Sequence, residues 1–280
     1  MGNGTDHVFA REIEEIVDNM TLMDDDLMSR VFDQNVLATE VVLRTILGEE
    51  IEVVETKAQC EMESPIVGGR TIRLDIFARS NSGDYFNCEI QRSNRGAIPR
   101  RARFHSSMMD SRMITAGEGY ANLKDSYVIF ITENDYFHEG KPLYRFLRRE
   151  DNGLLFDDGS YIIYVNGEYE GDDDIGRLLS DFRRRDLTGF NYPELESGVR
   201  QFKEGMEGRR AMCEAVEKYA EKYAEGKYDT GVIRGKEEGI IEGRVESIHA
   251  LMVNLHLSAE QAMESIGIPK SEFEKYKQML

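Results

Sequence analysis

Three things are scarce in this sequence, and each scarcity narrows what the chain can be. Cysteine occurs only three times in 280 residues, at positions 60, 88 and 213, in an odd number and without the spacing of a zinc site. We therefore expect free thiols in a reducing cytoplasm, not a disulfide framework. No run of about 18 apolar residues is present, so no membrane span is expected. The beginning, MGNGTDHVFAREIEEIV, lacks the charged-then-apolar layout of a secretory signal.

Positive charge is the third scarcity. The chain has 35 Lys and Arg residues against 53 Asp and Glu residues, which gives a formal net charge of −18. This balance argues against broad, non-specific affinity for nucleic acid, since such binding depends on neutralising phosphates with basic side chains. It leaves room for a local basic groove, because net charge says little about one face of a protein.

Two motifs of nucleotide chemistry are missing from the sequence, since neither a phosphate-cradling P-loop nor a glycine-rich dinucleotide fingerprint occurs. The five histidines are scattered, which does not suit a zinc site. The run Asp172-Asp173-Asp174 lacks the spacing and the closing glutamate of an EF-hand loop. The histidines and this run are therefore better explained as ordinary structural residues.

Hydrophobic periodicity and composition divide the chain into three regions. Residues 1–25 form a polar N-terminal tail, 26–190 an α/β domain, and 191–280 a helical region rich in Glu, Lys, Met and Ala. The methionine-rich helices at the C-terminus are candidates for packing or for forming a homo-oligomer. Within the middle region we predict helices over 27–47 and 99–116 against a mixed sheet of four to five strands. The strands are expected over 51–62, 71–80, 84–92, 126–134 and within 156–167.

The most informative stretch is RLDIFARSNSGDYFNCEIQ, residues 73–91. The Asn-Ser-Gly linker at 81–83 between two β-rich runs predicts a hairpin. With a three-residue loop, the pairs on one face are all apolar, which fixes the register because a slip of one residue would destroy that face. The expected apolar pairs are Leu74 with Ile90, Ile76 with Cys88 and Ala78 with Phe86. On the other face, Arg73 should lie opposite Gln91, Asp75 opposite Glu89, and Phe77 opposite Asn87.

This register places two carboxylates, Asp75 and Glu89, directly across from each other. Like charges in this position destabilise a sheet by up to roughly 1 kcal/mol, and burial adds to the cost or raises one pKa. A divalent cation between them removes the conflict, and Mg²⁺ takes such oxygen ligands. Gln91 points the same way and could hold a water or a phosphate oxygen. The alternative is a solvated strand face whose acids are neutralised by Arg73 or Arg79, and spacing alone does not decide between the two.

A basic segment follows the second strand of this hairpin. Residues 92–112 contain six arginines against one acid, Asp110, and helix N-terminal amides together with arginines suit a phosphate-binding surface. Arg101 and its neighbours Arg100 and Arg103 are the candidate phosphate contacts. The alternative is a solvated amphipathic helix whose arginines pair with surface acids. His105 lies in the same segment, where a packed or exposed histidine is a simpler explanation than a substrate contact.

Asp75, thirteen intervening residues, and then Glu89-Ile90-Gln91 resemble the PD-(D/E)XK nuclease superfamily. More closely, the chain resembles the Rpn-type PD-(D/E)XK nuclease family transposases, also called recombination-promoting nucleases. The resemblance covers roughly residues 25–190 and includes DDDLMSRVF, RRARFHSSMMD, YVIFITENDYF, FDDGSYIIYVNG and LLSDF. Leu74 stands where the superfamily usually has proline, and Gln91 replaces the superfamily lysine, as in the Rpn-type variant.

The resemblance implies a restriction-endonuclease-like fold and a DNA endonuclease that uses Mg²⁺, or Mn²⁺, to hydrolyse phosphodiester bonds, with a link to recombination or transposition. Asp75 and Glu89 would hold the ion with the carbonyl of Ile90 as a further ligand, Gln91 would orient the attacking water, and the arginines would position the DNA backbone. Glu40 stands where many members add a third acid, although a surface glutamate is the simpler explanation. The competing hypothesis is a non-catalytic interaction protein whose helical tail binds a partner. Cleavage of RNA instead of DNA is not separable from the sequence.

Overall fold

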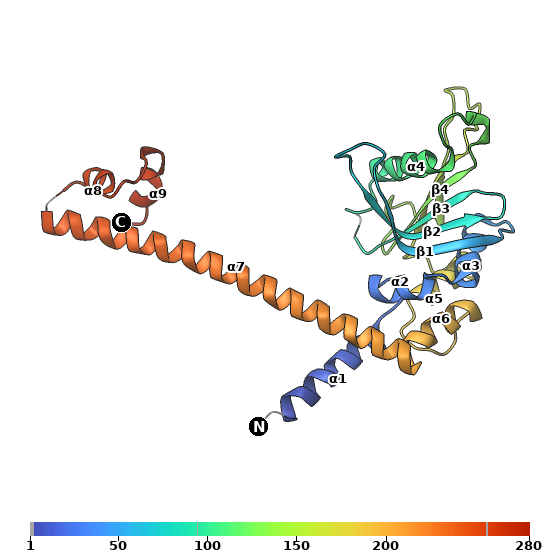
Figure 1. Ribbon diagram of the computed structural model, residues 1–280, viewed down its shortest axis with the longest axis horizontal. Coiled ribbons are helices and arrows are strands. Elements are labelled where there is room, and N and C mark those ends of the chain that lie inside the picture. The colour runs from blue at the N-terminus through green and yellow to red at the C-terminus, as the bar shows by residue number, and fades with distance from the viewer. Residues whose placement is uncertain (1–2, 94, 256) are drawn as a thin grey trace. The chain divides into compact units, whose positions relative to one another are not determined.

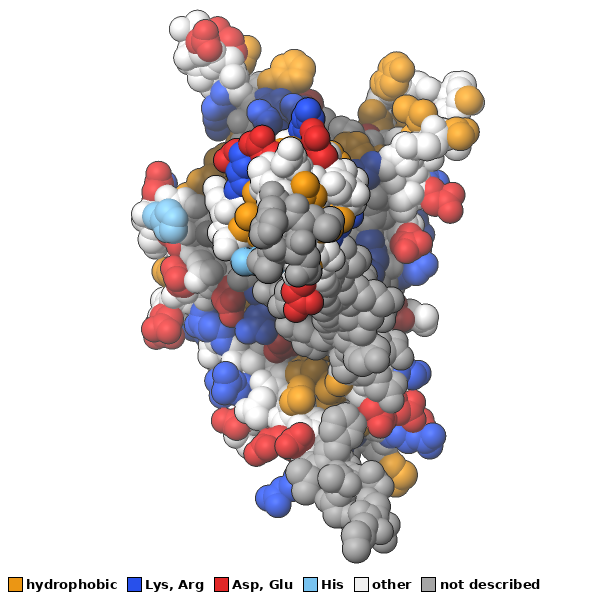
Figure 2. All heavy atoms as spheres, turned by 90° about the vertical axis from the view of Figure 1, so that its left-hand side faces the viewer, with side chains coloured by type: hydrophobic (Ala, Val, Ile, Leu, Met, Phe, Trp, Pro, Cys, Tyr) orange, Lys and Arg blue, Asp and Glu red, His pale blue; other side chains and the backbone are white. Residues whose placement is uncertain are grey.

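The structure is a computed structural model that describes residues 3–93, 95–255 and 257–280. By packing, the chain divides into two compact units, Met1–Val216 and Glu217–Leu280. Among the described residues, no helix is both long enough and apolar enough to cross a membrane. On the face shown in Figure 2, basic and acidic side chains are interspersed and do not gather into separate fields of one sign.

The first unit is built on a six-stranded mixed sheet with the strand order β1-β2-β3-β4-β6-β5. Its first three strands form an antiparallel meander, β4 runs parallel to β3, β6 runs parallel to β4, and β5 is antiparallel at the edge. The predicted α/β class with a mixed sheet is confirmed. The strands are β1 (Val53–Met62), β2 (Ile72–Ser80), β3 (Tyr85–Gln91), β4 (Ser126–Thr132), β5 (Leu143–Phe146) and β6 (Ser160–Asn166).

The prediction of four to five strands missed β5. This strand has only four residues, LYRF, of which one is buried. An edge strand of this length shows too little alternation of apolar and polar residues to be recognised from the sequence.

Helices cover both faces of the sheet (Figure 1), as the restriction-endonuclease-like class requires. The helix α4 (Pro99–Met113) lies on one face, where Ala102 and Met109 pack against Val128 and Phe130 of β4. The core on the other face is formed by strand residues such as Ile129 and by several helices. Those helices are α2 (Asp25–Phe32), α3 (Val36–Leu47), α5 (Asp174–Phe182) and α6 (Pro193–Lys203).

The single helix predicted over 27–47 is wrong at one point, since the structure has two helices there. The chain turns between α2 and α3, where Gln34 has a φ of 56°. The side chain of Asn35 then accepts a hydrogen bond from the backbone N–H of Ala38 at 3.2 Å and caps α3. An asparagine that caps a new helix satisfies orphan donors that a continuous helix would not have, so the break is stable.

Residues outside the predicted α/β domain also contribute to the first unit. The segment 3–19 forms α1 (Asn3–Asn19), in which Ile13 and Val17 are buried. Leu195 and Val199 of α6 lie in the same core. Our division of the chain at residues 25 and 190 therefore does not coincide with the division by packing, and it stays a prediction about function.

The second unit is helical. Much of it belongs to α7 (Met206–Leu255), and it ends in α8 (Ala259–Ser265), a 3₁₀ turn at Lys270–Glu272 and α9 (Phe273–Lys277). Ser258 and Gln261 form a reciprocal cap of α8. The chain turns after α8, where Gly267 has a φ of 75°. The small core contains Ile248, Ala262, Met263, Ile268, Phe273 and Tyr276.

Candidate active site

The hairpin of β2 and β3 has the predicted register, since Ile76 pairs with Cys88, Phe77 with Asn87 and Ala78 with Phe86. Regular pairing stops one step further on, so the predicted pairs of Asp75 with Glu89, Leu74 with Ile90 and Arg73 with Gln91 are not part of the ladder. There, the carboxylate of Asp75 accepts a hydrogen bond from the backbone N–H of Ile90 at 3.0 Å. A side chain thus takes the place of a backbone partner, and the two strands separate where the acids lie.

The sheet also changes faces at Asp75. Leu74 packs in the core beside α4, whereas Ile76 packs in the core on the opposite side. The prediction that both share one face is therefore wrong. The neighbouring β1 residue Gln59 has a φ of 50°, and alternation holds only while every residue is extended. The irregularity turns the carboxylate of Asp75 toward a cavity.

This cavity has a volume of about 220 Å³. Burial and the negative charge of Glu89 raise the pKa of Asp75 to about 7, although the Ile90 hydrogen bond opposes the shift. The predicted electrostatic conflict between the two acids is therefore present. The lining residues are Met23, Asp25, Met28, Arg73, Asp75, Ile90, Gln91 and Arg92.

Glu89 is completely buried, and its two carboxylate oxygens differ in their surroundings. Oε2 forms an ion pair with the guanidinium of Arg101. Oε1 lies 3.4 Å from Nδ1 of His105 and has no hydrogen-bond partner. The amide oxygen of Asn87 is also buried without a partner. A buried acceptor without a hydrogen-bond partner is costly, so it matters which nitrogen of His105 carries the proton.

A single assignment of the His105 ring serves the whole group. Nε of Arg101 donates to Nε2 of His105 at 3.3 Å, so the ring proton belongs on Nδ1. The amide of Asn87 lies 3.0 Å from Nδ1, and amide orientation is a choice that the hydrogen-bond network decides. With the amide turned, Nδ1–H donates to Asn87 Oδ1 and lies close to Glu89 Oε1. His105 thereby positions both Arg101 and Glu89, a role that its helical spacing did not reveal.

Gln91 joins the same group of side chains. It lines the cavity of Asp75, and it lies against Gly96, where an added Cβ would come within 1.7 Å of Gln91 Oε1. Arg101 donates to the carbonyl of Gly96 at 3.1 Å. The loop between β3 and α4 therefore brings Gln91 and Arg101 to the same glycine.

A second cavity of about 720 Å³ lies beside the first and is lined by five arginines and no acid. Arg73 lines both cavities, so they adjoin. The candidates Arg100 and Arg101 line this second cavity, whereas the exposed Arg103 does not. We refer to it as the arginine cavity. Its lining residues are Arg70, Thr71, Ile72, Arg73, Arg95, Gly96, Ile98, Arg100, Arg101, Phe104 and His105.

The structure does not bring Glu40 to the acid pair. Its carboxylate accepts a hydrogen bond from the N–H of Val53 at 2.8 Å and pairs with Arg44 at 3.5 Å. Val53 pairs with Ser80, which is roughly 17 Å along β2 from Asp75 at the usual rise per residue. Glu40 therefore anchors the start of β1.

Asp25 is the acid from the helical layer that does reach Asp75. It lines the same cavity, and its charge contributes to the raised pKa of Asp75. Its carboxylate accepts a hydrogen bond from the Gln59 amide at 2.7 Å. The acidic run at 24–26 stands at a helix N-terminus, where negative charge is favourable in any protein. Its position in the sequence therefore does not mark it as part of a site.

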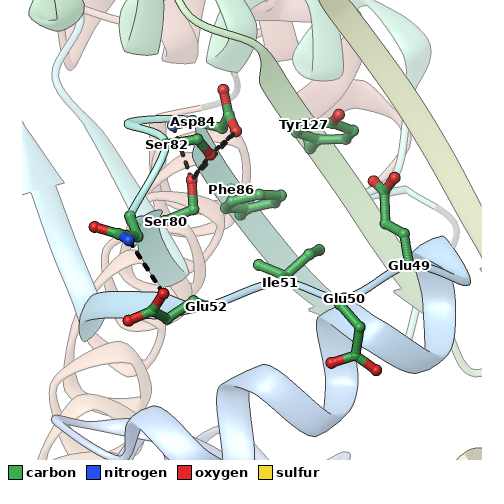
Figure 3. Close-up of a pocket in the computed structure, with 10 residues that line it drawn as sticks. Glu49, Glu50, Ile51, Glu52, Ser80, Ser82, Asp84, Phe86 and Tyr127 are labelled. Carbon is green, nitrogen blue, oxygen red and sulfur yellow. Dashed lines mark hydrogen bonds between the residues drawn. The ribbon is translucent and has the colours of Figure 1, made fainter.

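A third cavity, of about 390 Å³, lies near the hairpin turn at the other end of β2 (Figure 3). Its acids include Glu52, which accepts a hydrogen bond from the Asn81 amide at 3.1 Å, and Asp84, which accepts from Ser80. None of the residues around Asp75 lines this cavity, so it is separate from the candidate active site.

The donor set around Asp75 fits a hard divalent ion in its chemistry, since two acids and a nearby backbone carbonyl are oxygen ligands. The partnerless Oε1 of Glu89 and the raised pKa of Asp75 are both relieved by a cation. In the part of the chain that the structure describes, no three Asp, Glu, His or Cys side chains form a ready metal cluster. Arg101 occupies the other oxygen of Glu89, so this arginine must release Glu89 for the two acids to act together.

The six-stranded mixed sheet with helices on both faces defines a restriction-endonuclease-like, PD-(D/E)XK fold. Residues 34–166 match the family model described as PD-(D/E)XK nuclease family transposase. The predicted family is thus confirmed over a segment that contains Asp75, Glu89 and Gln91. No curated protein and no solved structure matches the chain.

Proposed function

We propose that this protein is a metal-dependent endonuclease that hydrolyses phosphodiester bonds of DNA, with Asp75, Glu89 and Gln91 at its centre. One observation carries the proposal: burial, and after it the negative charge of Glu89 on the neighbouring strand, raises the pKa of Asp75 to about 7. They do so beside a cavity lined by five arginines. Perturbed carboxylates next to a phosphate-binding surface are typical of functional sites.

Each residue has a distinct role in this proposal. Asp75 and Glu89, with the carbonyl of Ile90, would hold Mg²⁺ or Mn²⁺. Such an ion would supply a water of lowered pKa and charge compensation for the scissile phosphate. The amide of Gln91 orients the attacking water, because a neutral amide can both donate and accept. Arg101 contacts the phosphate together with Arg100, as its position in the arginine cavity allows.

The ion pair of Arg101 with Glu89 gives the site a resting arrangement. While Glu89 is held by the arginine, its charge is neutralised inside the fold. When Glu89 instead serves as a ligand, the guanidinium loses this partner and is free to take a phosphate oxygen, which it can bind in a bidentate way. The same side chain thus compensates charge before and after substrate enters.

Plasmid nicking in Mg²⁺ or Mn²⁺ tests the proposal. We expect Asp75→Asn and Glu89→Gln each to reduce the rate by at least about 100-fold, as loss of a group that stabilises charge in the transition state does. Glu40→Gln is the matched control, since its amide oxygen can still accept from Val53 N–H and the side chain is remote from Asp75. Cleavage that survives both acid substitutions would contradict the site assignment.

The second candidate function is a non-catalytic interaction protein on the same fold. The observation that favours it is again the Arg101–Glu89 ion pair, because it leaves a stable metal-free arrangement. A thermal melt with and without Mn²⁺ separates the two functions. An absence of both cleavage and metal-induced stabilisation favours the interaction protein, with the helical region 191–280 binding a partner or a second copy. A cytoplasmic location and a role in recombination or transposition stay predictions.

A further inference from the structure

The arginine cavity contains more apolar surface than a simple phosphate site needs. Ile98 and Phe104 line it and are 46% and 39% exposed. Ile98 is the N-cap of α4 and Phe104 lies in the second turn of the helix, whereas Ala102 between them is buried. Large apolar side chains left open inside a charged cavity indicate a ligand that has an apolar part.

Four arginines of this cavity have no acidic partner. Arg70, Arg73, Arg95 and Arg100 form no ion pair with any residue that the structure describes. Arg92, just outside the arginine cavity, pairs with both Asp24 and Glu133. The positive charge of the arginine cavity is therefore uncompensated, and it attracts an anion from outside the fold.

The ring of Phe104 lies on the same side of α4 as the phosphate-binding candidates. Arg100 and Arg101 precede Phe104 by four and three residues, and side chains at these spacings are neighbours on a helix. Among the described aromatic side chains, none is paired with the ring of Phe104. One turn of helix therefore presents two guanidinium groups beside an unoccupied aromatic face.

We propose that the arginine cavity receives an unpaired strand of DNA, with one base stacked on Phe104 and the adjacent phosphates on Arg100 and the other arginines of the cavity that have no acidic partner. This inference rests on the proposed function and names its substrate more closely. A base inside a duplex already has both faces stacked, so only an unpaired base can lie on a protein ring. Basic grooves that combine with an aromatic platform are how proteins hold single strands.

The depth of the acids supports the same conclusion. Glu89 is completely buried and meets the arginine cavity through Arg101, so a scissile phosphate must move below the protein surface to reach it. A cavity of about 720 Å³ is of the size that encloses a small ligand or a few nucleotide groups. A flexible single strand enters such a space more readily than a rigid duplex does.

Fluorescence anisotropy with the full chain in EDTA tests this inference, using one labelled oligonucleotide as a single strand and as its duplex at the same salt. We expect the single strand to bind at least about tenfold more tightly. Phe104→Ala should weaken single-strand binding by about 5- to 150-fold, which is the range for one stacked base, and change duplex binding less than about twofold. Phe104→Tyr should retain the preference. The matched control is Phe156→Ala, since Phe156 is 66% exposed and outside the arginine cavity.

Equal affinity for the two forms, an equal effect of Phe104→Ala on both, or no binding at all would each overturn the inference. Phe104→Leu keeps apolar volume without a π face, so it separates lost stacking from a folding defect and should behave like Phe104→Ala. Because binding is measured without metal, the two proposals fail separately. Phe104-dependent binding without any cleavage contradicts only the proposed function, whereas nicking of duplex without single-strand preference contradicts only this inference.

Discussion

At the scale of single residues, Asp75 both forms a hydrogen bond between two strands and has a carboxylate whose charge is unfavourable where it lies. Its carboxylate accepts the Ile90 N–H, which fixes the point where β2 and β3 separate. The same carboxylate is buried beside Glu89, which raises its pKa to about 7. An asparagine could accept the same hydrogen bond without the cost of a buried charge. A purely structural role at this position would therefore not need a carboxylate.

This cost can be measured through pH. The pKa of Asp75 rises from 3.8 to about 7 on folding, so the folded state binds the proton more tightly. Its favourable contribution to stability is complete below about pH 4 and is lost as the pH rises through 7. We expect Asp75→Asn to stabilise the metal-free protein at pH 8 by a few kcal/mol at most, because the neutral amide avoids the cost of the buried charge.

Urea denaturation in EDTA at pH 5 and pH 8 is the measurement for this prediction. The midpoint of the wild-type protein should fall relative to that of Asp75→Asn as the pH rises. When Mn²⁺ replaces EDTA at pH 8, it should stabilise only the wild type. An Asp75→Asn protein that is less stable than the wild type at pH 8 would show that the carboxylate is not under electrostatic strain.

At the scale of elements, the loop between β3 and α4 decides whether the two halves of the site meet. It carries Gly96, whose carbonyl accepts from Arg101 and whose α-carbon lies against Gln91. The strand β3 supplies Glu89 and Gln91, and α4 supplies Arg101 and His105. The close approach of this loop therefore holds the site residues of β3 next to those of α4.

Gly96→Ala tests this coupling. An added methyl group would come within 1.7 Å of Gln91 Oε1, so we expect Gln91 to move and nicking activity to fall by at least about tenfold, since positioning of a catalytic amide is worth this much or more. Gly119→Ala is the matched control, because nothing lies within 4 Å of its added Cβ. Equal rates for both variants would show that the position of Gln91 does not matter to the reaction.

The hairpin of β2 and β3 is the part of the fold that local sequence patterns predict best. Apolar alternation and an Asn-Ser-Gly linker predict the hairpin register because both act between neighbours in the chain. The change of faces at Asp75 was not predicted, because it depends on Gln59 in another strand. The break between α2 and α3 was also missed, because the apolar pattern continues on both sides of Asn35 and does not show that this residue caps a new helix.

At the scale of the whole molecule, an acidic chain gathers several arginines without acidic partners around one cavity. The net charge is −18, yet four arginines of the arginine cavity have no acidic partner among the described residues. Repulsion from the rest of the surface opposes non-specific binding, while this cavity attracts phosphate locally. Affinity for nucleic acid should therefore depend on few contacts.

The dependence of affinity on salt measures how many contacts there are. For a single strand, log K against log salt concentration should have a slope of about −0.7 for each phosphate contacted. Arg70→Gln should make the slope shallower by about one contact or less. Arg210→Gln is the control, since Arg210 lies outside the arginine cavity and pairs with Glu214 on the surface. A slope that is unchanged by Arg70→Gln but altered by Arg210→Gln would place the binding surface elsewhere.

The sequence by itself determined the hairpin that carries Asp75 and Glu89, because its turn and register follow from residues close along the chain, and the resemblance of its motifs to a known family indicated the fold class. Only the tertiary structure decided which other groups reach that hairpin. It brings Asp25 to the acids and Glu40 to the far end of β2, and it pairs Arg101 directly with Glu89 beside His105. These choices depend on how α2, α3 and α4 dock on the sheet, and docking is set by the summed packing of distant side chains, which no local pattern contains.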